Sequence, residues 1–391
     1  MMCYRVPESK RFRRAAIALG VALGLLLGGC GLETSPPLPT SLAWSADDSQ
    51  LMYLSLSGTY LTGVTSQLRL WTEASGKSKT VVSLSGQIDN FAWASERGLV
   101  AYSIRSEGRN EVNGSRVVVL RIADRREVAR FDMEIEDPSY PLHVSWSADE
   151  SWLAMEATNQ GRRIRLIHDS EYGDPRYIAA SGTSGIAWDT ESARLSYVSN
   201  GRIYVANPAS LEVTEVATAD QAIGPVGGPP FRPGFDEVAF TASHFVAPGD
   251  YTTRLAVSNL ASGEVETLVE RKDGPIPEAG WSHDGLRLAF TAYDGLDCAQ
   301  SEREHVGESL PEFSQAKING LLPLTKGPGP TTCILEGGQA RPLVREPDGY
   351  ASSFAWSNRS ARIAYSGKPD SQSEEGIYVL DPVSNELQRI V

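Results

Sequence analysis

The chain has 391 residues, of which 41% are apolar and 8% aromatic, and its formal net charge is −13 at pH 7. This composition excludes an intrinsically disordered chain. The acidic balance argues against a nucleic-acid-binding protein, because a negative surface repels the phosphate backbone. The length is large for a single hydrophobic core but ordinary for a ring of repeats.

Residues 1–29 have the pattern of an export signal rather than of a folded element. Five basic residues precede an apolar run, Ala15 to Gly29, which is too short to remain as a membrane span. The run leads into Leu27-Gly28-Gly29-Cys30, which resembles the lipobox of bacterial lipoproteins. The resemblance implies cleavage before Cys30, lipidation of that cysteine, and anchoring to a bacterial membrane outside the cytoplasm, in the cell envelope. An ordinary signal peptide, or a membrane anchor with a chance cysteine, is the alternative.

Cleavage there would remove five basic residues and one acidic residue, so the mature chain would have a formal net charge of about −17. Because such a protein repels anionic headgroups, the lipid itself would have to hold it at the membrane. Residues 30–41 would then be the lipidated cysteine and a tether, in which Pro36, Pro37 and Pro39 favour an extended chain. At roughly 3 Å per residue, the tether keeps the folded body within about 30 Å of the membrane.

Seven copies of one hairpin pattern recur between residues 42 and 391. Each copy has an aromatic anchor, a branched aliphatic residue seven positions later and, in six copies, a small residue at the eighth position. The anchors are Trp44, Trp93, Trp146, Trp188, Phe231, Trp281 and Trp356. Side chains alternate between the two faces of a strand, so the pattern predicts two apolar strands joined by a tight turn.

A second, weaker pair of strands follows each hairpin. The fourth copy shows it best, with residues 202–206 and 212–216 on either side of a turn at Asn207-Pro208. Four strands per copy and anchor spacings of 42 to 75 residues predict an all-β fold, a seven-bladed β-propeller of four-stranded antiparallel blades. The seventh copy completes its fourth strand near Val391, so we expect the ring to close blade against blade without a shared strand.

The sixth copy, Trp281-Ser282-His283-Asp284-Gly285 followed by Leu288-Ala289-Phe290, resembles the PD40 repeat of TolB-type propellers, a WD40-like repeat. The first and third copies keep most of the motif, and the fifth, at Phe231, is degenerate. The resemblance covers residues 42–391 and implies the propeller fold. It implies little about function, because the repeat occurs in binding scaffolds, envelope proteins and the propeller parts of peptidases and lyases.

The wide spacing between the last two anchors predicts an insertion at about residues 295–330 in the sixth blade. Cys298 and Cys333 flank it, and they are the only cysteines besides Cys30 that would survive cleavage. In an exported protein this favours a disulfide over two free thiols. The bridge would close a loop of about 35 residues and contribute roughly 3–4 kcal/mol.

In a propeller of this strand order, the second-to-third loops and the blade-to-blade connectors lie on one face, here named the connector face. The turns within the two hairpins of each blade lie on the other, the hairpin face. Most long segments belong to the connector face: residues 103–115, 132–143, 217–229, 241–253 and 294–330. Long loops in compact repeats are usually functional, so we expect the ligand to bind there.

Three histidines, His143, His244 and His305, map to the connector face. They belong to different blades and lack the spacing of metal ligands, so solvated loop histidines are the simpler interpretation and no metal or cofactor is expected. No catalytic set stands out in the sequence.

These features favour a monomeric, membrane-anchored scaffold that binds a protein, peptide or glycan-like envelope polymer through the connector face. Two alternatives remain. An enzyme acting on glycans or peptides, as a lyase or hydrolase, would need two or three carboxylates or histidines converging at the ring axis. A purely structural envelope spacer would lack a concave patch on the connector face.

Overall fold

The structure is a computed structural model of the chain. It describes residues 41–59, 63–104, 114–134, 142–157, 163–168, 175–179, 184–218, 222–224, 231–247, 250–272, 276, 278–292, 298, 331–343, 349–370 and 372–391. The predicted leader, Cys30, the tether up to Thr40 and residues 299–330 of the predicted insertion lie outside the described residues.

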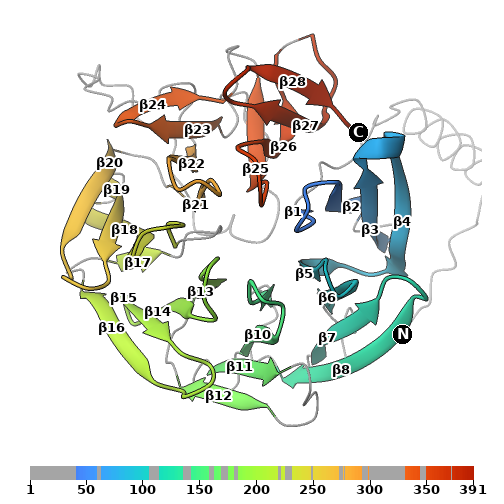
Figure 1. Cartoon of the computed structure of the whole chain (residues 1–391), viewed down its shortest axis with the longest axis horizontal. Helices are drawn as coiled ribbons and strands as arrows, with labels where there is room; N and C mark the ends of the chain where they lie inside the picture. The colour runs from blue at the N-terminus through green and yellow to red at the C-terminus, as the bar shows by residue number, and fades with distance from the viewer. Residues whose placement is uncertain are drawn as a thin grey trace, which may run out of the picture. The chain divides into compact units, whose positions relative to one another are not determined.

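Within these residues, 28 strands form seven four-stranded antiparallel sheets arranged around a common axis (Figure 1). The innermost strands are β1 (Leu42–Trp44), β5 (Ile88–Ala94), β9 (Val144–Trp146), β13 (Ser184–Trp188), β17 (Ala222–Gly224), β21 (Ala279–Trp281) and β25 (Tyr350–Trp356). The second strands are β2 (Gln50–Thr59), β6 (Leu99–Ile104), β10 (Trp152–Ala157), β14 (Leu195–Ser199), β18 (Glu237–Ala247), β22 (Arg287–Ala292) and β26 (Ile363–Lys368).

The third strands are β3 (Gly63–Thr72), β7 (Gly114–Arg121), β11 (Arg163–His168), β15 (Arg202–Ala206), β19 (Asp250–Asn259), β23 (Thr331–Glu336) and β27 (Gly376–Asp381). The outermost strands are β4 (Lys77–Ser85), β8 (Arg126–Glu134), β12 (Arg176–Ala179), β16 (Val213–Thr218), β20 (Val265–Lys272), β24 (Gln339–Pro342) and β28 (Glu386–Arg389). A single 3₁₀ turn, η1 (Glu73–Ser75), joins β3 to β4 in the described chain. The prediction of an all-β, seven-bladed propeller is confirmed.

Each interface between neighbouring blades holds its own hydrophobic cluster among the described residues. In five of them the anchor tryptophan packs with the small residue eight positions after the anchor of the preceding blade, as Trp146 does with Ala101. A large ring fits there because alanine leaves a shallow surface on the facing sheet. Blade 1 has Met52 at the small position, and the facing anchor, Trp93, is the one that stays partly exposed.

The Ser-x-Asp part of the motif closes the turn between the first two strands of a blade. In blade 6 the Ser282 hydroxyl donates to the Asp284 carboxylate (2.5 Å) and accepts the Arg287 N–H (3.0 Å). Blades 1 and 3 repeat the arrangement with Ser45 and Ser147 in place of Ser282. The polar residues of the motif are therefore structural, because they satisfy backbone groups that a tight turn leaves open.

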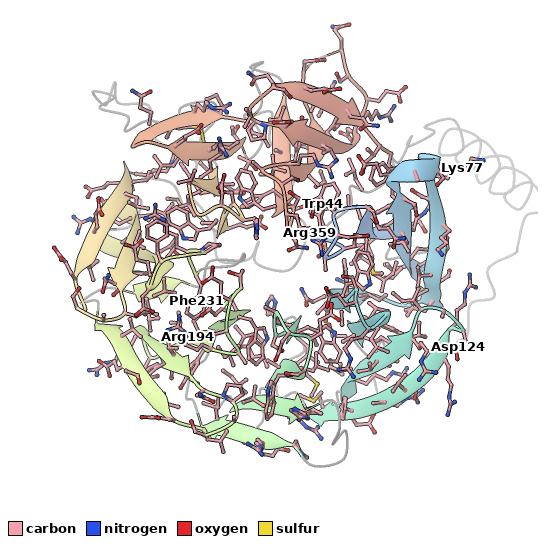
Figure 2. All side chains as sticks on the ribbon, in the orientation of Figure 1. Trp44, Lys77, Asp124, Arg194, Phe231 and Arg359 are labelled. Carbon is pink, nitrogen blue, oxygen red and sulfur yellow. A yellow bond between two sulfur atoms is a disulfide. The ribbon has the colours of Figure 1, made fainter. Side chains whose placement is uncertain are left out.

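The ring closes between blades 7 and 1 without a shared strand, because every sheet consists of four consecutive strands. Side chains hold this seam on the hairpin face. The Asp48 carboxylate accepts the backbone N–H groups of Asn358 (2.6 Å) and Arg359 (3.0 Å), and the Trp44 indole N–H donates to the Ala355 carbonyl (3.1 Å). Figure 2 labels both sides of the seam, Trp44 on blade 1 and Arg359 on blade 7.

Blade 5 departs from the predicted pattern in two ways. Residues 241–253 were expected as a long loop, but residues 241–247 and 250–253 form the extended ends of β18 and β19, which pair as far as Ala247 with Asp250. The run is rich in β-branched and aromatic residues, which favour strand pairing over a loop. The anchor Phe231 forms only an isolated bridge with Val238, while the innermost strand is β17, earlier in the chain. The degenerate motif thus accompanies an altered inner strand.

The predicted disulfide between Cys298 and Cys333 is present, with a Cα–Cα distance of 5.8 Å. Cys333 lies in β23, and both cysteines are buried in the cluster between blades 5 and 6. The bridge therefore pins the start of the segment between β22 and β23 to the sheet. Because that segment joins a second strand to a third, its ends belong to the connector face.

Candidate functional site

The starts of the innermost strands bring polar side chains from several blades toward the connector end of the ring axis. Figure 1 shows these strands lining the centre of the ring. Each runs from the connector face to the hairpin face, because the chain enters every blade from a connector and leaves its first strand through a hairpin turn. Residues just before or at the start of these strands are the candidate site.

One position, three residues before the anchor, links neighbouring inner strands. In blade 2 the Asn90 side-chain oxygen accepts the N–H of Val144 in blade 3 (3.1 Å). In blade 6 the Glu278 carboxylate accepts the N–H of Phe354 in blade 7. Both donors lie two residues before their own anchors. The Asn90 amide and the Glu278 carboxyl therefore accept equivalent cross-blade hydrogen bonds at two different blade interfaces.

Glu278 differs from Asn90 in being able to ionise. Burial raises its pKa to about 8, against the opposing effect of the Phe354 N–H. A carboxyl with that pKa is largely protonated at neutral pH and can donate a hydrogen bond as well as accept one. The backbone carbonyl of Glu278 accepts the Thr291 N–H (2.9 Å), which holds the residue against the second strand of its blade.

His143 precedes β9 and keeps exposed side-chain surface at the connector end. Its carbonyl accepts the Glu156 N–H (3.1 Å), which ties it to β10. Surrounding protein atoms displace part of its water and lower the pKa of the imidazole, while the nearby Asp89 carboxylate acts in the opposite direction. His143 therefore favours the neutral form, which can both donate and accept a hydrogen bond.

Blade 7 adds an aromatic group at the same end. The Tyr350 hydroxyl, at the start of β25, donates to the Glu375 carboxylate (2.6 Å), which lies before β27. Burial and this carboxylate raise the pKa of Tyr350, so the phenol stays protonated. Glu374, beside it, pairs with Arg389 (2.6 Å).

The hairpin face uses its charged side chains differently, as bonds between neighbouring turns. The Glu150 carboxylate accepts the N–H groups of Glu96 and Arg97 in the preceding blade (both 3.0 Å). Glu150 takes a positive φ of 55°, four residues after its anchor, where the full motif has glycine. Figure 2 labels a further contact, Arg194 of blade 4 with Phe231 of blade 5, whose ring centroid lies 5.5 Å from the guanidinium carbon.

Blade 6 shows why glycine occupies that position in the full motif. Gly285 has φ +66°, and a Cβ there would lie 2.5 Å from the Pro233 carbonyl oxygen of blade 5. Its own carbonyl accepts from the Arg232 guanidinium (2.8 Å). Hairpin turns of neighbouring blades thus touch at these places, where Glu150 and Arg232 use their side chains to join them.

Of the three histidines predicted on the connector face, only His143 has a described side chain. His244 lies in β18, where its backbone pairs with Thr252, but its side chain lies outside the description, as does all of His305. No group of three His, Cys, Asp or Glu side chains in the described ranges could hold a metal ion. Across the same ranges, no helix is long and apolar enough to span a bilayer.

Asp89, Glu278 and Tyr350 were not singled out from the sequence. The position three residues before the anchor carries Asn90, His143 and Glu278, so an alignment of the repeats on their anchors would have shown the polar position. The partners across the blades could not have been found this way, because they depend on how one inner strand is staggered against the next.

No protein-family model matches the sequence, and no curated protein matches it. Solved structures match the fold. The β-propeller domain of Cps50 (Swd1) from Myceliophteria thermophila has a TM-score of 0.53 and 10% sequence identity over 89% of this chain and 96% of that one. The β-propeller domain of the Trilobed protease from Pyrococcus furiosus, which has an open velcro topology, gives a TM-score of 0.58 and 7% identity over 92% and 96%. These similarities show the fold, a β-propeller, and leave its ligand open.

Proposed function

We propose that the protein is an exported lipoprotein, anchored through Cys30, whose TolB-like propeller is a scaffold that binds a protein, peptide or envelope polymer at the connector face. The observation that carries the proposal is the contrast between the two faces. On the hairpin face, Glu150 and Arg232 bond the turns of neighbouring blades, whereas the connector end carries the exposed His143 side chain and the base of a disulfide-pinned insertion.

The described groups favour binding over catalysis. Asp89 and His143 lie near each other in blades 2 and 3, but Glu278 belongs to blade 6 and uses its carboxylate to bond blade 7. An acid–base pair would have to stand within hydrogen-bond reach of one reacting atom. Polar groups spread over several blades instead suit a ligand that contacts a wide surface.

The insertion provides the test of the binding face. Residues 301–328 would be replaced by a short Gly-Ser linker, which leaves Cys298 and Cys333 free to form their bridge. Envelope extract would be passed over this variant, the parent protein, and a control with Ser262→Ala in a hairpin-face turn of blade 5. We expect the linker variant to lose partners that the parent and the control retain. Equal recovery by all three proteins would defeat the assignment of recognition to the insertion.

Lipid attachment has its own test. Cells expressing the full chain would be fed an alkyne-bearing fatty acid, and the purified protein would be analysed by mass spectrometry. The parent should carry label on Cys30, and Cys30→Ser should carry none. Label-free parent protein, or an N-terminus other than Cys30, would refute the anchor.

A further inference from the structure

We infer that the anchored protein stands with its connector face toward the bilayer, so that its ligand is a protein held in or at the same membrane. The inference rests on the proposed lipidation of Cys30. It concerns the orientation of the ring and the location of its partner, which the anchor alone does not determine.

The first step is the place where the tether joins the ring. The described chain begins at Ser41, and Leu42 starts the innermost strand of blade 1. The Ser41 carbonyl accepts the Leu54 N–H (3.2 Å), which fixes the tether's end against β2. Because β1 runs from the connector face to its hairpin turn, the tether leaves the ring on the connector face, beside the axis.

The second step is the tether's reach. Eleven residue steps separate Cys30 from Ser41, so an extended tether spans about 34 Å. To bring the hairpin face to the membrane, the tether would first have to pass outward across the three spacings between β1 and β4, about 14 Å. It would then have to run down the ten residues of β3, about 33 Å further. That route exceeds the reach.

The shorter route along the axis would thread the chain and its acyl groups through a closed ring. Folded chains avoid threading of this kind. The tether is therefore long enough to hold the connector face near the bilayer and too short to let the ring turn over.

The third step concerns the partner. With the connector face turned inward, whatever binds it must enter a layer no thicker than the tether is long, about 30 Å. A membrane-embedded or membrane-attached protein meets this condition, whereas a polymer lying beyond the ring would meet the hairpin face first. The mature chain's formal charge of about −17 also repels anionic headgroups. This repulsion keeps the ring from lying directly on the membrane and so leaves space for a partner between them.

The experiment uses two labels on one blade. Ser57, exposed near the connector end of β2, and Ser75, exposed in the hairpin-face turn of the same blade, would each be changed to cysteine and labelled with a fluorescent donor. Lipidated protein would be bound to phosphatidylcholine vesicles that carry an acceptor dye on lipid headgroups. Cys298 and Cys333 are occupied in the disulfide and do not compete for label.

The labels differ in height by roughly 25 Å, so we expect energy transfer from the label on Ser57→Cys to exceed that from the label on Ser75→Cys by about twofold or more. Equal transfer would indicate a ring lying on its edge, and a reversed order would indicate an inverted ring; either result overturns the inference. A second pair on blade 7, Glu374→Cys for the connector face and Ser384→Cys for the hairpin face, covers a failure of either first variant to fold.

A chain that starts at Gly31, without the leader and Cys30, and that carries each label provides the control and separates the two proposals. It should remain unbound and show no transfer. If the parent protein also remains unbound, the lipid anchor itself is refuted, and the orientation with it. If the parent binds and the labels report the wrong order, only the orientation is refuted.

Discussion

Replacing Glu278 by glutamine should stabilise the protein at alkaline pH. Glutamine keeps an oxygen that can accept the Phe354 N–H, as Asn90 does for Val144 in blade 2, and it cannot ionise. The wild-type carboxyl pays an electrostatic cost when it loses its proton in a buried place. Glu278→Gln removes that cost and leaves the cross-blade bond.

The magnitude follows from the pKa. Burial raises the pKa of Glu278 from 4.5 to about 8. For an acid with a raised folded-state pKa, the unfolded chain ionises first, so stability falls as pH rises from 4.5 toward 8 and then stays low. The full shift corresponds to an upper limit of about 5 kcal/mol at pH 9, and because the side chain keeps some exposure we expect about 2–3 kcal/mol.

The assay is urea-induced unfolding of Glu278→Gln and the wild type at a series of pH values from 4 to 9. The difference in unfolding free energy should be small at pH 4 and reach its full value near pH 8. His143 contributes in the opposite direction, since its lowered pKa costs stability as pH falls below 6.5, but this contribution cancels in the difference. Glu374→Gln, which removes an exposed acid, is the control. A difference that does not change with pH would refute the buried-carboxyl explanation.

Three further predictions concern the ring's construction. Asp48→Ala, which leaves backbone donors at the seam unpaired, should lower the unfolding free energy by about 2–4 kcal/mol. Asp48→Asn keeps an acceptor and should lower the unfolding free energy less. Equal thermal stability of the two variants would contradict the role of the acceptor. Gly285→Ala should lower the unfolding free energy by about 1–3 kcal/mol more than Gly263→Ala does, as measured by chemical denaturation. Both positions have positive φ, but only at Gly285 would the added Cβ clash with a neighbouring turn. The reverse order would argue against the close approach between turns. Replacing both Cys298 and Cys333 by alanine should lower the unfolding free energy by roughly 3–4 kcal/mol. Wild-type protein unfolded in reducing buffer should lose the same amount of unfolding free energy. An unchanged unfolding midpoint would show that the disulfide does not stabilise the fold.

The architecture could be predicted from the sequence because the spacing of apolar residues repeats in every blade. The anchors and the branched residues seven positions later directly pair in register, as Trp281 does with Leu288. Small residues at the eighth position also have a visible purpose, since the next blade's anchor packs on them. These relations lie within ten residues of each other or repeat identically from blade to blade, so the pattern carries them.

The features that were not predicted depend on contacts between blades. Asp48 and Glu150 read as ordinary polar turn residues, yet each occupies the motif's glycine position and bonds the turn of the preceding blade. Glu278 reads as a loop carboxyl until its position is compared with Asn90 and its donor, Phe354, is seen in the next sheet. A side chain's partner in the neighbouring blade depends on how the two sheets are staggered. The residue pattern within one repeat does not contain that information.

Because each blade is one uninterrupted stretch of chain, the seam between blades 7 and 1 lacks a covalent link but divides no sheet. Its anchor tryptophan and its small facing residue, Trp44 and Ala364, pack as their counterparts do elsewhere. The break in the chain could therefore be moved to another connector, such as residues 86–87 between β4 and β5, without dividing any sheet. Such a circular permutant would carry the proposed anchor on a different blade but still at the connector face. The position of the tether around the ring can therefore be chosen separately from the fold.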